Sequence, residues 1–93
     1  MEREVEATVR VQIDEKITIV DISNAIQAFD SEVYISKTVN GAFHEINLKS
    51  FLGLITLQLH NGDLVTLRTV GTDSEETFQA VLSYLGERYD ETR

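Results

Sequence analysis

The stretch INLKSFLGLITLQL, residues 46–59, joins the end of a polar strand to a run of apolar and small residues. Ser50 stands at the boundary, where its hydroxyl can accept a hydrogen bond from a free N–H in the first turn of a helix. We predict a short helix from Ser50 to about Leu57. Its apolar side chains leave no continuous polar face: Phe51, Leu52, Leu54, Ile55 and Leu57. Such a helix cannot bury every side in a small domain, and an exposed apolar patch usually marks a partner.

Composition limits the class of protein. The 93 residues predict a single domain, residues 1–93, with one modest core. A net charge of −8 argues against binding nucleic acid or an anionic membrane, because both need a basic surface. Cysteine is absent, which excludes disulfides and thiolate metal sites. No apolar run approaches the roughly 20 residues that span a bilayer, and the polar N-terminus does not resemble a signal peptide. We therefore expect a soluble cytoplasmic protein.

The N-terminal third contains an alternating segment and a helical one. Residues 4–13 alternate between apolar and polar side chains, which is typical of an antiparallel strand with one wet face. Residues 18–29 carry apolar side chains at helical spacing, with Thr18 as a candidate cap and Asp21 in the first turn. Because this segment is rich in β-branched residues, a strand over residues 16–20 is the alternative.

Residues 32–48 carry a specific local signal, the pair Asn40-Gly41, which favours a two-residue type I′ hairpin turn. A hairpin folded at this pair places Val33, Ile35 and Lys37 on one face. Lys37 and His44 make the inward face polar near the turn, so we expect the tip to project beyond the core.

The C-terminal third predicts a turn, a strand and a helix. Asn61-Gly62-Asp63 is the turn, residues 63–70 are the strand, and Asp73 or Ser74 can cap the last helix. The apolar stripe of that helix is Phe78, Val81, Leu82 and Leu85, with Arg88 at or just past its end. The whole order predicts an α+β fold, an open-faced β-sandwich with a four-stranded antiparallel sheet and three helices on one face.

Several motifs resemble those of HPr, the phosphocarrier protein of the bacterial sugar phosphotransferase system, over nearly the whole chain. The residues 47–54, NLKSFLGL, resemble the family's regulatory-serine segment. Phe29-Asp30 resembles the pair that closes its first helix, and Asn40-Gly41 matches its hairpin turn. Gly62, Gly71 and Asp73 keep the family's spacing. The hairpin is longer than in the usual pattern by an equal addition to each arm, which preserves the inward-facing residues.

The chain departs from the family at the phosphate-carrying motif. HPr proteins that carry phosphate have Gly-Ile-His-Ala-Arg-Pro-Ala at the start of the first helix. Counting back from Asp30 puts Glu15 at the histidine position, Ile17 at the arginine position and Thr18 at the proline position, and no histidine precedes His44. The resemblance therefore implies a scaffold without its imidazole nucleophile. We expect no phosphohistidine carrier activity and no enzymatic activity.

Two functions remain open. In the first, the protein is a regulatory or protein-binding module. The resemblance implies that its docking face comprises Ile17, Val20, Phe51, Leu52 and Ile55. In the second, the protein is still phosphorylated, either at Ser50 by an HPr kinase or, as a residual phosphocarrier, at His44 or Glu15. The partner would be a phosphotransferase-system component, an HPr kinase or a transcription regulator, and a homodimer could also cover the patch. We expect no cofactor and no metal, because His44 and His60 lack the spacing of metal ligands.

Overall fold

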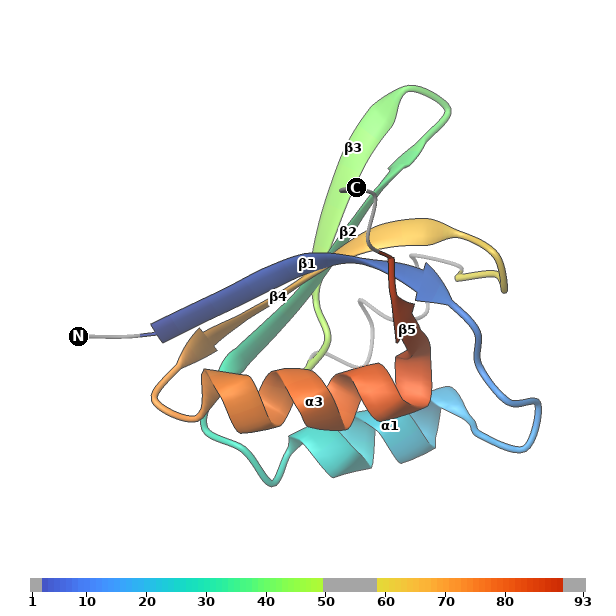
Figure 1. Cartoon of the computed structure of the whole chain (residues 1–93). Helices are drawn as coiled ribbons and strands as arrows, with labels where there is room; N and C mark the ends of the chain where they lie inside the picture. The colour runs from blue at the N-terminus through green and yellow to red at the C-terminus, as the bar shows by residue number, and fades with distance from the viewer. Residues whose placement is uncertain (1–2, 50–58, 90–93) are drawn as a thin grey trace.

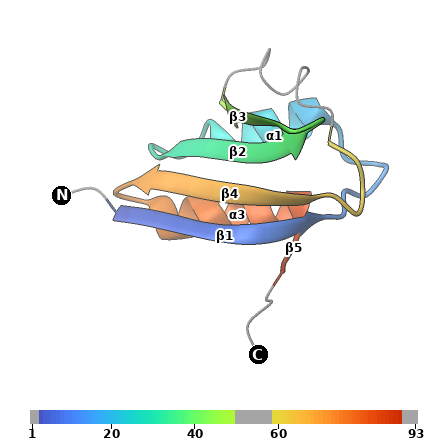
Figure 2. The same cartoon turned by 90° about the horizontal axis from the view of Figure 1, so that it is seen from above.

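The structure, a computed structural model, describes residues 3–49 and 59–89. Its elements, in chain order, are β1 (Arg3–Val11), α1 (Ile19–Ile26), β2 (Glu32–Val39), β3 (Ala42–Asn47), β4 (Leu64–Gly71), α3 (Ser74–Leu85) and β5 (Gly86–Arg88). The predicted helix from Ser50 to about Leu57 lies outside the described residues. Figure 1 shows α1 and α3 side by side beneath the sheet, and Figure 2 shows the sheet from its open side. This arrangement is the predicted open-faced α+β sandwich.

The sheet contains one strand more than predicted. Its order is β3-β2-β4-β1-β5, with antiparallel pairing at each step. The extra strand, β5, follows α3 directly and pairs with β1, where Val9 faces Arg88 and Val11 faces Gly86. Gly86 allows this approach, because a Cβ there would collide with the Arg10 carbonyl oxygen. The prediction of four strands was therefore wrong by one strand at this edge, while Arg88 lies just past the end of α3, within its predicted range.

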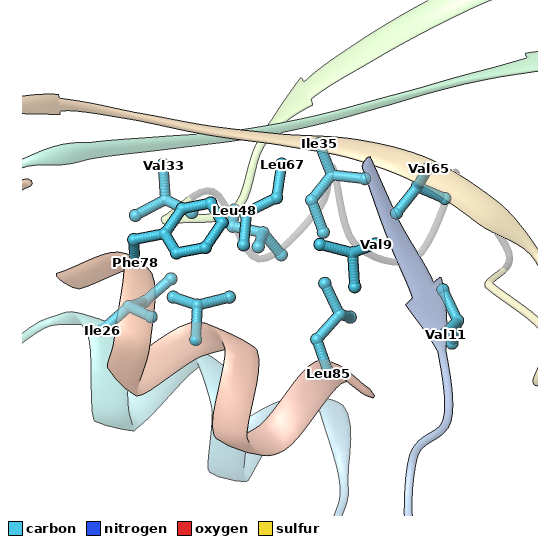
Figure 3. Packing of buried hydrophobic residues seen from close by; sticks show 11 residues of the cluster. Val9, Val11, Ile26, Val33, Ile35, Leu48, Val65, Leu67, Phe78 and Leu85 are labelled. Carbon is cyan, nitrogen blue, oxygen red and sulfur yellow. The ribbon is translucent and has the colours of Figure 1, made fainter. Parts of the chain in front are cut away.

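Alternating side chains from the strands form the core with the two helices. In β4, Val65, Leu67 and Thr69 are buried, while the residues between them lie on the open face. Val9 and Val11 are buried in β1. Phe78 of α3 lies between the helices and the sheet, close to Ile26, Val33 and Leu67 (Figure 3). The alternate buried residues of the strands thus pack against the apolar stripe of α3, as the sequence patterns predicted.

The first helix begins where its cap predicts. The Oγ1 of Thr18 accepts a hydrogen bond from the Asp21 N–H at 3.1 Å, and the Asp21 carboxylate accepts one from the Thr18 N–H at 2.9 Å. This reciprocal capping box satisfies two N–H groups that a helix start otherwise leaves free. Residues 19 and 20 are helical, so the alternative strand over residues 16–20 was wrong. The helix ends at Ile26, three residues earlier than the predicted boundary at residue 29.

The β2–β3 hairpin has the predicted register. Val39 faces Ala42, Lys37 faces His44 and Ile35 faces Ile46 across the Asn40-Gly41 turn. Both turn residues have positive φ, 51° and 81°, as a type I′ turn requires. The tip extends beyond the helices (Figure 1), and β3 is exposed from Ala42 to Glu45.

Asp73 lies at the N-cap position of α3, but its side chain accepts no capping hydrogen bond from a backbone N–H of the helix, and only the Thr77 hydroxyl of α3 donates to it, at 3.3 Å. Its carboxylate instead accepts hydrogen bonds from the N–H groups of Asp30 and Ser31, each at 2.9 Å, and from the Ser31 hydroxyl. The Ser31 hydroxyl and the Asp30 N–H are the main causes that lower the pKa of this carboxyl to about 2. The expectation that Asp73 or Ser74 caps α3 through its side chain was therefore wrong, because the Asp73 carboxylate ties α3 to the loop after α1.

Candidate functional site

The loop from β1 to α1 holds Glu15 and Ile17, two of the three positions at which the sequence is predicted to depart from the phosphocarrier motif. Asp14 folds this loop into a turn, in which its carboxylate accepts from the Lys16 N–H and its carbonyl accepts from the Ile17 N–H, both at 2.8 Å. Glu15 is exposed at the turn, and Ile17 is partly exposed just after it. The loop therefore presents a carboxylate and an apolar side chain to solvent.

The N-terminus of α1 is already occupied by an anion. The Asp21 carboxylate is 2.9 Å from the Thr18 N–H and lies in the first turn, where the helix dipole favours negative charge. A phosphoryl group bound at this helix start would meet that carboxylate, with Asp14 and Glu15 in the preceding loop adding further negative charge. Val20, the second residue of the helix, is 46% exposed. The start of α1 thus combines the Asp21 carboxylate in its cap with the exposed apolar side chain of Val20.

A turn from a distant part of the chain supports this loop. The Asn61 side chain accepts from the Ile13 N–H at 2.8 Å and donates to the Ile13 carbonyl at 3.3 Å. The Gly62 N–H donates to the Val11 carbonyl, and the Val11 N–H donates to the Asp63 carbonyl. These backbone contacts connect the turn at residues 60–63 to the start of the loop that contains Glu15.

Lys49 is the last described residue before the segment 50–58, and its hydrogen bonds hold it near the C-terminal end of α1. The Lys49 ammonium donates to the Phe29 carbonyl at 2.6 Å, and the Gln27 amide donates to the Lys49 carbonyl at 3.3 Å. The residues flanking 50–58 are therefore tied to α1, to the residues that follow it and to the loop before it. The predicted residues Ser50, Phe51, Leu52 and Ile55 belong to the segment 50–58, outside the described residues.

Neither histidine stands at the start of α1. His44 lies in β3, opposite Lys37. His60 belongs to the supporting turn, where its Nδ1 is 3.9 Å from an Asp63 carboxylate oxygen. That oxygen accepts from the Lys37 ammonium at 2.8 Å, which lowers the pKa of Asp63, and the His60 N–H lowers it further. Turn contacts thus place His60 on the side of the molecule that carries the Glu15 loop, with Asp63 as its charged neighbour.

The arginines that the structure describes lie in strands. The Arg68 Cζ lies 4.4 Å from the centre of the Tyr34 ring, and the Arg10 Cζ lies 5.2 Å from the centre of the Tyr89 ring. Both pairs lie on the open face of the sheet. Arg68 also lies 3.7 Å from a Glu4 carboxylate oxygen. Within residues 3–49 and 59–89, no group of three or more histidine, aspartate or glutamate side chains could hold a metal ion. In the same residues, no helix is long and apolar enough to cross a bilayer.

The fold and this site define a class of protein. The family model described as "PTS HPr component phosphorylation site" matches residues 18–87, and the chain belongs to this family. The match includes Ser50 and begins after Glu15 and Ile17.

Relatives and solved structures agree with the family. The chain is similar to the HPr-like protein Crh of Halalkalibacterium halodurans, with 27% identity over 91% of this chain and 95% of the relative. It also has the fold of the phosphocarrier protein HPr from Bacillus anthracis, with a TM-score of 0.67, 22% identity and coverage of 90% and 96% of the two chains. HPr-C-His from Thermoanaerobacter tengcongensis matches with a TM-score of 0.67, 21% identity and coverage of 89% and 90%.

Sequence reasoning missed two positioning residues, Asn61 and Asp73. Asn61 was predicted as part of a turn, and Asp73 as a local cap. Their partners, Ile13 and the pair Asp30 and Ser31, are more than forty positions away in the chain. Turn and cap patterns carry no information about such distant partners, so only the folded chain identifies these roles.

Proposed function

We propose that this protein is a regulatory, protein-binding member of the HPr family that has lost phosphohistidine carrier activity. Its docking face comprises Ile17 and Val20, together with Phe51, Leu52 and Ile55 from the segment outside the described residues. The partner is a protein, of which a phosphotransferase-system component, an HPr kinase or a transcription regulator is the candidate class.

The acidic capping box at the start of α1 is the observation that carries this proposal. Thr18 and Asp21 satisfy each other's N–H groups there, so the protein's own carboxylate already lies at the helix start. Glu15 adds a second negative charge in the loop, and Ile17 offers no hydrogen-bond donor to a phosphoryl group. Phosphoryl groups at helix starts are held by free N–H groups and cationic side chains. The same helix start exposes Val20, which suits an apolar partner surface.

Transfer of phosphate from phosphoenolpyruvate tests the lost carrier activity. The protein is incubated with phosphoenolpyruvate and the general phosphotransferase enzyme, and its intact mass is measured before and after mild acid treatment. We expect no acid-labile phosphate, while an HPr that carries phosphate gives one under the same conditions. An acid-labile phosphate that disappears in His44→Ala, His60→Ala or Glu15→Gln would reinstate a carrier role.

A pair of charge-matched variants tests the docking face. Val20→Asp places a charge on the exposed residue at the start of α1, where a carboxylate is compatible with the helix dipole. Gln79→Asp adds the same charge at an exposed position of α3 and serves as the control. A partner captured by the unaltered protein and by the control should be lost with Val20→Asp. Retention of that partner by Val20→Asp would remove Val20 from the interface.

Phosphorylation of Ser50 is the second candidate function; the matching family model, described as an HPr phosphorylation site, spans this serine without naming the modified residue. A phosphoserine at a helix N-terminus is electrostatically compatible with the helix dipole. Incubation with ATP and an HPr kinase should add one acid-stable phosphate that is absent from Ser50→Ala. An unchanged mass would exclude this regulatory modification, and the result is independent of the docking test.

A further inference from the structure

The two edges of the sheet differ in length and in what they offer a partner. One edge is β5, which has three residues, two of them the exposed and charged Glu87 and Arg88. The other is β3, which has six residues and ends the strand order among the described residues. Natural sheets usually protect an edge with a very short strand, charged side chains, a proline or a bulge. The β3 sequence AFHEIN contains no proline, its pairing with β2 continues without a bulge, and Glu45 is its one acidic side chain.

The register identifies which backbone groups of β3 point outward. In an antiparallel pair, facing residues alternate between those that exchange hydrogen bonds and those that do not. The Leu48 N–H donates to the Val33 carbonyl at 2.7 Å, so the even-numbered residues of β3 pair with β2. Phe43, Glu45 and Asn47 therefore direct their N–H and C=O groups away from the sheet. These three residues form what we call the free edge.

Side chains along the free edge supply specificity. Phe43, Glu45 and Asn47 also share the open face of the sheet, because alternate residues of a strand point the same way. Phe43 is 70% exposed, the highest value among the exposed large apolar side chains that the structure describes. The Glu45 carboxylate accepts a hydrogen bond from the Arg68 guanidinium at 3.4 Å, and 37% of the Glu45 side chain stays exposed. An added strand would thus meet an aromatic side chain and a carboxylate two residues apart.

The negative charge of this chain favours a different protein over a second copy of the chain as the partner of the free edge. Two copies would each bring a net charge of −8 to the contact. Self-pairing centred on Glu45 would place two carboxylates directly opposite each other, which is unfavourable. A basic strand offers the complement, since opposite charges that face each other across two strands stabilise the pairing.

We propose that the free edge of β3 binds an extended basic segment of a partner protein as an additional antiparallel strand. The segment carries Lys or Arg opposite Glu45 and, two residues later, a β-branched or aromatic residue opposite Phe43. Main-chain hydrogen bonds supply affinity in this mode of recognition, and alternate side chains supply specificity. The proposal uses neither Ile17 nor Val20, so it stands independently of the docking face at α1.

Amide hydrogen exchange and NMR shifts, measured on the full chain, test the proposal. The probe is the capped peptide TKTVTKTV, compared with its acidic analogue TETVTETV and with a basic copy methylated on the amide nitrogens of lysine and valine. We expect the basic peptide to shift and protect the amides of Phe43, Glu45 and Asn47, and the two comparison peptides to have much weaker effects. Equal effects of all three peptides, or no protection of these amides, would overturn the proposal.

Two variants separate charge from strand addition. Glu45→Lys should weaken binding of the basic peptide by about two- to fivefold, the effect of one cross-strand charge pair, and should favour the acidic analogue. Glu45→Pro removes an outward N–H without removing a bond to β2, and proline is accepted at such edge positions. This variant should abolish the protection that the basic peptide gives to the amides of Phe43 and Asn47. The far-UV circular dichroism spectrum checks that the sheet is intact. Binding that survives both variants would overturn the proposal, as would light scattering that shows a dimer with the same amides protected in the protein alone.

Discussion

The acidic residues at the starts of α1 and α3 have different kinds of hydrogen-bond partner. Both helices begin beside an acidic residue that a local reading would assign to capping. At α1, Thr18 and Asp21 bond to each other within a single turn. At α3, the Asp73 carboxylate bonds to Asp30 and Ser31, which lie 43 and 42 residues earlier. The first helix start is a local structure, whereas the second is a tertiary joint between α3 and the loop that leads into β2.

Because of this difference, we expect the cap of α1 to affect only its own helix, and the Asp73 contacts to affect the stability of the whole domain. Fraying of the first turn of α1 leaves the sheet and α3 in place, because the capping box touches neither. Loss of the Asp73 contacts releases the loop before β2, a strand whose Val33 and Ile35 are completely buried in the core. The packing at this joint is also close, since a Cβ on Gly71 would lie 2.5 Å from the Ser31 hydroxyl. We therefore expect changes at Asp73 to affect the cooperative unfolding of the whole domain.

The largest effect is expected for Asp73→Ala. This variant leaves the N–H groups of Asp30 and Ser31 and the Ser31 hydroxyl without their acceptor, and a polar group that loses its partner destabilises a fold. The urea midpoint should fall further than for any single change at the α1 cap, with the urea m-value unchanged. Asp73→Asn, which keeps one acceptor oxygen, is the control and should lose less. Equal stability of Asp73→Ala and the unaltered protein would show that this joint is not a structural link.

A smaller effect is expected for Thr18→Ala. Removal of a capping hydroxyl costs about 1 kcal/mol of helix stability. Amide exchange should accelerate in the first turn of α1, while the protection of β2 and β4 stays close to that of the unaltered protein. Thr18→Ser retains the hydroxyl and should restore most of the loss. Faster exchange throughout the sheet would contradict a local role for this cap.

The smallest effect is expected for the pH dependence of stability that the Asp73 carboxylate causes, because this dependence appears only in acid and is absent near neutral pH. The pKa of this carboxyl lies at about 2 in the folded protein, below its usual 3.8. Its ionised form therefore adds stability that is fully present above about pH 4 and is lost as the pH falls through about 2. Urea midpoints measured from pH 5 to pH 2 should fall more steeply in the unaltered protein than in Asp73→Asn. Parallel curves for the two proteins would assign the acid dependence to other carboxyls.

Local patterns predicted much of the fold, while only three of the seven predicted site residues lie within the described part of the chain. The Asn40-Gly41 pair predicted a hairpin whose register the structure confirms, because a two-residue turn determines which residues face each other. Thr18 and Asp21 predicted the start of α1 for a similar reason. Strand β5 was not predicted, because three residues after a helix have no detectable period and gain their partner only from the nearby edge of β1. Val20 lies in the first turn of α1, Glu15 and Ile17 lie in the loop before it, and the roles assigned to them stay predictions.

The sequence by itself determined the order of the elements, the faces of the strands and the acidic character of the first helix start, since each depends on residues within a few positions of one another. Only the tertiary structure decided that Asn61 supports the loop of Glu15, that Asp73 joins two distant segments, and that β5 pairs with β1 at one edge of the sheet while β3 ends the strand order at the other among the described residues. These features depend on which distant segments pack together. That choice follows from burial of the whole core and cannot be read from any single stretch of the chain.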